Sequence, residues 1–143
     1  MGLTPGSSSL RRRAPTVRSG WALLNRLKLE RNDTKADVVL GDRYGTSCVA
    51  AVSETVEATL CELGYAVSRN KPYAGGFITE HYGNPAAGLH AIQIEVNRAL
   101  YMDERRFELS SDFTQLSQDL VSLADKLAAI PLEELRPYRA AAE

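Results

Sequence analysis

Residues 36–69, ADVVLGDRYGTSCVAAVSETVEATLCELGYAVSR, decide the fold. The short apolar run from Ala36 to Gly41 predicts a buried strand. After it, apolar side chains recur every three or four residues, as on one face of a helix: Val49, Val52, Val56, Leu60 and Leu63. Gly64 suits the left-handed residue that ends such a helix, and 65–69 is typical of a second strand. Strand, helix and strand form a βαβ unit, so we predict an α/β fold with a parallel or mixed sheet.

A polar loop, residues 42–47 (DRYGTS), joins the first predicted strand to the helix. Thr46 or Ser47 is predicted to cap the helix with its hydroxyl group. Cys48 and Cys61 lie near the two ends of this helix, too far apart along it to form a disulfide. Neither belongs to a CxxC pair, so both are predicted to be small core residues in a reducing compartment, with a catalytic thiol as the alternative.

The next stretch, residues 70–104, reads NKPYAGGFITEHYGNPAAGLHAIQIEVNRALYMDE and holds both histidines. Its first part, 71–76, is predicted to be a turn whose double glycine lets backbone approach backbone or a ligand closely. His81 is predicted to lie on a loop, where its imidazole is free to act as acid, base, ligand or hydrogen-bond donor. A strand is predicted from Leu89 to Val96.

Alternation sorts the side chains of this last strand onto two faces. One face is apolar except for its histidine: His90, Ile92, Ile94 and Val96. The other face ends in Gln93 and Glu95, with Asn97 next if the strand continues. Sites form at the carboxyl ends of strands in open, mostly parallel sheets, so Glu95 is a candidate site residue. The alternative is that Gln93 and Glu95 face water on an antiparallel edge strand.

A long helix is predicted near the end of the sequence. Asp112 and Gln115 have the spacing of a capping box, and Pro131 ends the helical pattern. The apolar stripe between them consists of Phe113, Leu116, Leu120, Leu123, Leu127 and Ile130. We expect this helix to pack across the sheet, and residues 131–143 to form a frayed tail.

The totals of the chain exclude some classes of function. At 143 residues it has the length of one domain, and its formal net charge of −1 gives no reason to expect nucleic acid. No apolar run approaches the roughly 20 residues that span a bilayer. We therefore predict a cytoplasmic protein with neither nucleic acid nor membrane as partner.

Residues 1–35 differ from the rest, because they are rich in arginine and serine and contain no acidic residue before Glu30. They are predicted to be a basic, poorly ordered leader or a divergent segment. The alternatives are an organelle transit peptide and a basic arm that contacts phosphate backbones.

The sequence from Pro72 to Met102 resembles the N-formylglutamate amidohydrolases, also called N-formylglutamate deformylases. It matches the family pattern PYxGGxxTxxYGxPxxGxHAxQxExNRxLYM at each specified position. Residues 40–48 (LGDRYGTSC) also resemble the family segment that follows its central strand. The resemblance covers residues 36–130, the C-terminal half of the family's domain.

The resemblance implies a fold and a reaction. The fold would be like that of the zinc carboxypeptidases and aspartoacylases, with a partial sheet flanked by helices and truncated on its N-terminal side. The reaction would be hydrolysis of N-formyl-L-glutamate to formate and L-glutamate in histidine degradation, with a divalent, zinc-like metal ion. By position, Glu95 is the expected catalytic base and Arg98 the expected clamp for a substrate carboxylate. The other residues expected to contact the substrate are Tyr73, His81, Tyr82, Gln93 and Asn97.

The chain departs from the family where the metal ligands are expected. Those ligands lie in the family's N-terminal half and in an Asp-x-His-Ser strand, but here residues 20–35 read GWALLNRLKLERNDTK and no histidine precedes His81. A catalytic zinc needs about three protein ligands. The local candidates are Glu80, His81, His90 and Glu95, and strand alternation points His90 away from Glu95. We therefore expect this chain to lack the ligands.

Three functional hypotheses remain open. The chain is an amidohydrolase that acts through Glu95, or an inactive truncated remnant of that family, or a partner-binding module recruited through Arg11–Arg13. The two hydrolase hypotheses imply a sheet cut near its middle, which leaves a strand edge uncovered. Self-association is therefore expected.

Overall fold

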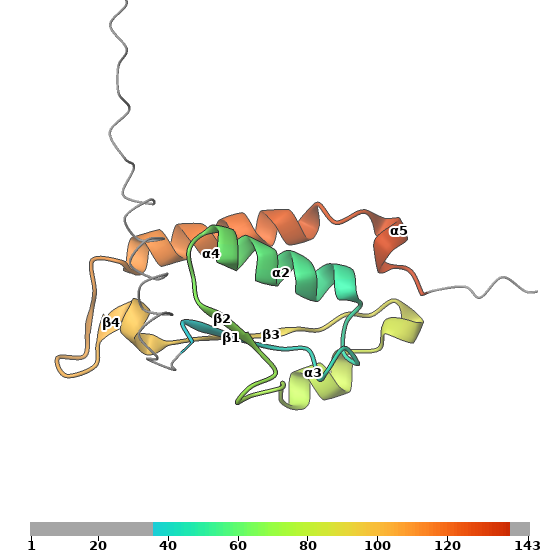
Figure 1. The fold of residues 1–143 in the computed structure, drawn as a ribbon, viewed down its shortest axis with the longest axis horizontal. Helices are drawn as coiled ribbons and strands as arrows, with labels where there is room; N and C mark the ends of the chain where they lie inside the picture. Colours follow the sequence, from blue (N-terminus) through green and yellow to red (C-terminus); the bar gives the residue numbers. More distant parts are fainter. Residues whose placement is uncertain (1–35, 138–143) are drawn as a thin grey trace, which may run out of the picture.

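The computed structural model describes residues 36–137, in which a small sheet is flanked by helices (Figure 1). The elements are β1 (Val38–Gly41), α2 (Ala50–Glu62), β2 (Val67–Arg69), α3 (Phe77–Tyr82), η1 (Pro85–Ala87), β3 (Gln93–Val96), η2 (Arg98–Leu100), β4 (Met102–Asp103), β5 (Glu108–Leu109), α4 (Phe113–Ala128) and α5 (Leu132–Leu135). The leader predicted for residues 1–35 lies outside the described residues, as does 138–143.

Three strands form the main sheet in the order β2-β1-β3. β1 and β2 are parallel, with Val38 opposite Val67, and α2 connects them. The predicted βαβ unit is therefore confirmed. β3 runs antiparallel to β1, with Gly41 opposite Gln93, so the sheet is mixed.

The core lies between one face of this sheet and the helices α2 and α4, which pack side by side over it (Figure 1). Its buried members are Val38, Leu40, Val56, Leu60, Tyr65, Leu100, Leu116 and Leu123. Ile94 and Val96 of β3 pack against this core, so the predicted sorting of their strand onto two faces is confirmed. α3 lies on the other side of the sheet.

The helix α2 ends as predicted but begins differently. Gly64 follows it with a φ of +95°, the left-handed conformation that glycine adopts without strain. Its N-cap residue is Val49, which makes no side-chain capping bond, so the predicted cap by Thr46 or Ser47 is wrong. Both hydroxyl groups donate instead to backbone carbonyl oxygens, which fixes the loop before the helix.

The helix α4 is the predicted long helix, and its leucines at 116, 120, 123 and 127 pack on the core. The predicted capping box is wrong, because Asp112 makes no side-chain capping bond and Gln115 Nε2 donates to Asp119 Oδ1 at 2.9 Å. The buried Asp119 also accepts from the Tyr65 hydroxyl at 2.7 Å. This contact joins α4 to the segment before β2.

The region between β2 and β3 differs from the sequence prediction. His81 lies in the helix α3, not on a loop, because the carbonyl oxygen of Gly76 accepts from Glu80 N and begins a helical turn. The strand predicted from Leu89 begins only at Gln93, since β1 ends at Gly41 and offers no earlier partner. Before that point Leu89 forms an isolated bridge with Asn84.

The C-terminal range predicted to be a frayed tail begins with α5. The carbonyl oxygen of Leu135 lies 2.8 Å from His90 Nε2. No helix within residues 36–137 is long and apolar enough to cross a bilayer.

Candidate functional site

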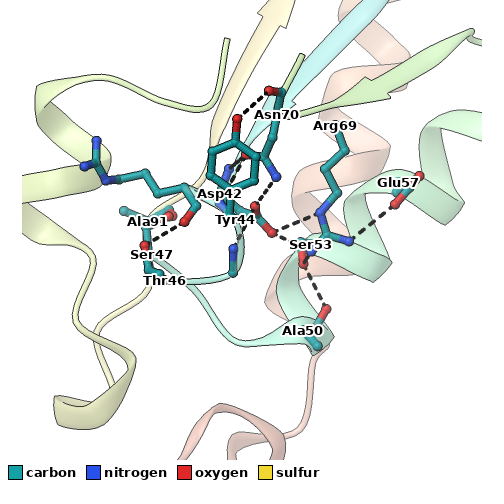
Figure 2. A network of polar contacts seen from close by, with 12 residues as sticks. Asp42, Tyr44, Thr46, Ser47, Ala50, Ser53, Glu57, Arg69, Asn70 and Ala91 are labelled. Carbon is teal, nitrogen blue, oxygen red and sulfur yellow. Dashed lines mark hydrogen bonds and ion pairs between the residues drawn. The ribbon is translucent and has the colours of Figure 1, made fainter. Parts of the chain in front are cut away.

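A polar network lies where the parallel strands β1 and β2 end (Figure 2). Asp42 directly follows β1 and is fully buried. Its carboxylate accepts hydrogen bonds from Arg69 through Nε at 3.0 Å and through Nη2, and from Asn70 Nδ2 at 2.7 Å. The backbone N–H of Gly45 donates to it as well, at 3.1 Å. A buried charge is costly unless it is paired and hydrogen-bonded, and Asp42 meets both conditions.

Arg69 extends the network to α2. Its Nη2 also donates to Ser53 Oγ, and its Nη1 lies 3.6 Å from Glu57 Oε2 (Figure 2). The guanidinium therefore connects the end of β2 with α2 and with Asp42.

Asn70 fixes the loop after β1. Its Oδ1 accepts from the backbone N–H groups of Asp42 at 3.2 Å and Tyr44 at 3.3 Å. Arg43, Tyr44 and Asn70 have φ values of +51°, +58° and +58°. Left-handed backbone costs about 1–2 kcal/mol for each residue that is not glycine. The hydrogen bonds of Asn70 offset this cost.

Burial raises the pKa of the Asp42 carboxyl, but the hydrogen bonds from Arg69, Asn70 and Gly45 and the charge of Arg69 outweigh it. The pKa is therefore lower than the ordinary value of 3.8. Its hydrogen bond to Asp42 raises the pKa of Arg69, which stays protonated. An ionised carboxylate with this many partners is unsuited to proton transfer, so the network positions loops.

Two glycines let the loop 71–76 lie directly on the end of β1. A Cβ atom at Gly41 would come within 2.5 Å of Gly75 N and 2.7 Å of the carbonyl carbon of Ala74. Arg43 N donates to the carbonyl oxygen of Ala74 at 2.8 Å. The close approach predicted for the double glycine is thus a contact between backbones.

Glu95 lies in the middle of β3, opposite Val39 of β1. The predicted position at the carboxyl end of a parallel strand is wrong, because β3 runs antiparallel to β1 and toward the other end of the sheet. The alternative, an antiparallel edge strand, is what the described residues show. The side chain is exposed and accepts a hydrogen bond from Gln93 Nε2. Gln93 Oε1 accepts from Gly76 N at 2.8 Å. One amide group therefore joins Glu95 to the glycine loop before α3.

The helix α3 presents two further candidates on the same side of the sheet. The ring of His81 stacks on Phe77 with centroids 5.1 Å apart and meets Tyr82 edge-on at 4.7 Å. Arg43 Nη2 lies 3.6 Å from Glu80 Oε1, which connects α3 to the loop after β1. Tyr73 is exposed in the loop that leads into α3.

Asn97 and Arg98 lie beyond the other end of β3. Asn97 Oδ1 accepts from Ala99 N at 3.2 Å and caps η2, where Arg98 is exposed. A strand rises about 3.3 Å per residue, so Asn97 begins about 13 Å from Gln93 along the chain. The structure brings Gln93 and Glu95 to the loop before α3 and does not bring Arg98 there.

Comparison with known proteins identifies the family. A family model described as N-formylglutamate amidohydrolase matches residues 16–102, more than half of the chain. The chain belongs to the N-formylglutamate amidohydrolase family. The predicted membership is confirmed, and the matched range also includes residues upstream of 36.

Two curated relatives are N-formylglutamate deformylases. The chain is 37% identical over 84 residues to that of Pseudomonas putida, covering 57% of this chain and 32% of the relative. It is 34% identical over 87 residues to that of Pseudomonas aeruginosa PAO1, covering 59% and 33%. The chain thus spans about a third of the length of the curated relatives it matches.

A solved structure shows the same local fold. The crystal structure of N-formylglutamate amidohydrolase from Ralstonia eutropha JMP134 matches with a TM-score of 0.63 and 39% sequence identity. The match covers 79% of this chain and 39% of that chain.

Within residues 36–137, no group of three or more His, Cys, Asp or Glu side chains is placed to hold a metal ion. His90 contacts Leu135 through Nε2, whereas Glu95 lies on the other face of the strand. These residues do not fit a catalytic zinc site, which needs about three protein ligands.

The network of Asp42, Arg69 and Asn70 was not predicted from the sequence. The signal was present, because Asp42 follows β1 and Asn70 follows β2, and these are the carboxyl ends of adjacent parallel strands. Such ends are where sites form in α/β sheets.

The two cysteines have different environments. Cys48 is buried as predicted, and burial and the Asp42 carboxylate raise the pKa of its thiol. Cys61 is exposed, so the prediction that both are core residues is wrong. It follows the core residue Leu60 on α2 and points away from the core that Leu60 enters. Burial and Glu57 also raise the pKa of Cys61, so neither thiol suits a catalytic nucleophile.

Proposed function

We propose that this chain forms part of the active site of an N-formylglutamate amidohydrolase, with Glu95 as the general base. One observation carries the proposal: the exposed Glu95 carboxylate accepts from Gln93, whose Oε1 accepts from Gly76 N. All three residues match the family pattern. The names of the relatives, N-formylglutamate deformylase and amidohydrolase, support the choice of substrate.

Glu95 has the chemistry that the reaction needs from a base. Its carboxylate takes a proton from water as the water oxygen attacks the formyl carbon, and gives a proton to the amine as the C–N bond breaks. The products are formate and L-glutamate. The family resemblance implies a divalent, zinc-like ion for this reaction. Since residues 36–137 do not fit its site, the proposal assigns no step to a metal held by this chain.

Gln93 orients the base in this proposal. Gly76 N–H is a donor, so it requires the carbonyl oxygen of the Gln93 amide. The NH₂ group must then face Glu95, to whose carboxylate it donates. Gln93 therefore acts on Glu95 instead of on the substrate.

A substrate carboxylate needs a cation near Glu95. Arg98 is the sequence candidate, and it follows β3 three residues after Glu95. Arg43 pairs with Glu80 of α3 and is next to the glycine loop through its own backbone N–H. Arg98 therefore stays the first candidate for the carboxylate clamp and Arg43 is the second, since a guanidinium binds a carboxylate through two parallel hydrogen bonds.

Finer points of the resemblance belong to the same proposal. They are a likeness to the zinc carboxypeptidases and aspartoacylases, a small-molecule N-formyl amino acid as substrate, a place in histidine degradation and a cytoplasmic location. The alternative function is an inactive family member. For the isolated chain, the poor fit of residues 36–137 to a metal site favours that alternative.

A chimera tests the function. Residues 36–137 replace the matching part of the Ralstonia eutropha protein, and formate release from N-formyl-L-glutamate is measured. We expect turnover in the chimera and its loss in the Glu95→Gln variant, with substrate binding kept. A chimera that keeps its turnover after Glu95→Gln contradicts the proposal.

The isolated chain is the comparison for this assay. With added zinc, cobalt or manganese we expect it to release no formate, because three ligand groups are needed and residues 36–137 do not place them together. Robust turnover of the isolated chain, abolished by Glu95→Gln, would show that it is a complete enzyme.

A further inference from the structure

The helix α3 exposes its apolar side chains and buries a polar one. Phe77 is 71% exposed and Tyr82 is 59% exposed, whereas Thr79 is only 1% exposed. A surface helix normally shows the reverse arrangement. The Thr79 hydroxyl donates to the carbonyl oxygen of Gly76 at 2.7 Å, and Gly83 N donates to the carbonyl oxygen of Thr79 at 3.2 Å. These two bonds lie within α3 and its caps, whereas the contacts of Gly76 N with Gln93 Oε1 and of Glu80 with Arg43 attach the helix to the sheet and to the loop after β1.

Part of the exposed apolar area is joined by ring contacts. His81 contacts Phe77 and Tyr82 on α3, and Ile78 and the loop residue Tyr73 are more than half exposed. We name this area, consisting of Tyr73, Phe77, Ile78 and Tyr82, the α3 surface. An aromatic side chain has roughly 150–250 Å² of surface, so at these exposed fractions the area is roughly 300–600 Å², the size of the largest apolar patch on a typical monomer, which is often functional.

We propose that the α3 surface binds the part of an N-formylglutamate amidohydrolase chain that this sequence does not cover. The Ralstonia eutropha structure matches 79% of this chain but only 39% of its own chain, so most of that domain has no counterpart here. α2 and α4 already cover one face of the sheet, and α3 lies on the other (Figure 1). The additional polypeptide therefore has this face to pack against.

The position of the candidate base favours this occupant over a second copy. Gln93 contacts the loop that begins α3, and Glu95 lies on the same face of β3. A polypeptide that covers α3 would thus reach Glu95 and add groups that residues 36–137 do not place there. A second copy would bring the same groups again. The identity of the partner rests on the proposed function, but its binding needs no catalysis.

Co-expression tests the interface. This chain, carrying an affinity tag, is produced together with the part of the Ralstonia eutropha protein outside the match, and the purified material is measured by light scattering. We expect a complex with one copy of each polypeptide. Phe77→Glu should lower the recovered partner at least tenfold, since a charge replaces an apolar side chain that the interface buries. Glutamate suits the first turn of a helix, so α3 itself is preserved.

Val121→Glu is the matched control. Val121 is an apolar residue of α4, on the other face of the molecule, and is 62% exposed. We expect this variant to recover the partner as the unsubstituted chain does. Tyr82→Ser is the second test variant, and circular dichroism confirms that each variant is folded.

Three outcomes overturn the proposal: no recovered partner, recovery that Phe77→Glu and Tyr82→Ser leave unchanged, and a homodimer that Phe77→Glu abolishes. The proposed function fails separately. If the complex forms but the chimera is inactive, the proposed interface stands and the proposed reaction is contradicted. If the chimera is active but no complex forms, the proposed reaction stands and the proposed interface is contradicted.

Discussion

Asp42 is a single residue on which two loops depend. Its buried carboxylate accepts from Arg69, Asn70 and Gly45. We expect Asp42→Ala to lower the free energy of unfolding by about 1–3 kcal/mol, because the buried Asn70 amide loses its acceptor, whereas the partly exposed Arg69 keeps Glu57 and Ser53. Urea denaturation measures the change. Arg106→Ala removes an exposed ion pair with Asp103 and should cost less than about 1 kcal/mol. Equal effects of the two substitutions would contradict the role of Asp42.

The same residue gives a pH dependence with a definite sign. The pKa of Asp42 in the folded chain is lower than the ordinary 3.8, so the folded state binds its proton less readily than the unfolded state. Ionised Asp42 contributes its full stabilisation at pH values above 3.8, the ordinary pKa. This stabilisation is lost as the pH falls through the lower pKa of the folded state. Urea midpoints of the unsubstituted chain and Asp42→Asn should therefore converge in acid. A constant difference between them would contradict this account.

Gln93 is the residue that joins the glycine loop to the candidate base. We expect Gln93→Ala to speed hydrogen exchange at Gly76 N–H about tenfold, since the amide loses its acceptor. Gln93→Glu keeps an acceptor for Gly76 but no longer donates to Glu95, so it should preserve slow exchange and lower kcat in the chimera. Gln118→Glu, an exposed change on α4, is the control for added charge. Equal kcat values for Gln93→Glu and the control would show that Gln93 does not orient the base.

At the scale of the element, α2 separates the two thiols. Cys48 precedes the helix and is buried, whereas Cys61 is exposed near its C-terminal end. We expect a thiol reagent to modify Cys61 first in the folded chain and to reach Cys48 only in denaturant. Mass spectrometry of the modified peptides checks this order, and Cys61→Ser should remove the early reaction. Rapid modification of Cys48 in that variant would show that the loop after β1 opens readily.

The elements that local pattern determines were predictable. β1, α2 and β2 follow from an apolar run, a helical period and a closing glycine, all within one short stretch. The direction of β3 could not be predicted, because it depends on how the chain turns at η1 and on pairing with β1, a strand far away in sequence. The helix caps failed for a related reason. Ser47 donates to the carbonyl oxygen of Ala91, a partner that no local pattern reveals.

The site was predictable to a similar extent. Alternation placed Gln93 and Glu95 on the face opposite the core side of β3, since that face follows from a period of two. Arg69 and Asn70, the hydrogen-bond partners of Asp42, are more than twenty residues away in sequence. Only the parallel pairing of β1 with β2 brings the three residues together. The sequence alone therefore predicted the candidate base, Glu95, but not the network of Asp42, Arg69 and Asn70 that fixes the loop after β1.

At the scale of the whole molecule, the main sheet has two edge strands that lack a neighbour on one side among the described residues. Within residues 36–137, β2 and β3 are the outer strands of the main sheet. Exposed strand edges pair with other chains, so we expect self-association that increases with concentration. Light scattering over a concentration series measures it. Edge pairing should persist in Phe77→Glu, which separates it from contacts of the α3 surface, and a monodisperse monomer at all concentrations would contradict it.

The contact between Gly41 and Gly75 has a consequence for protein engineering. A methyl group at position 41 would collide with the backbone of Ala74 and Gly75 in the loop before α3. A substitution in β1 would therefore displace a loop that lies far from it in sequence. Anyone who transplants this loop into another βαβ scaffold must therefore move both glycines together, although they are far apart in the gene. Saturation libraries that vary one strand at a time would miss this dependence.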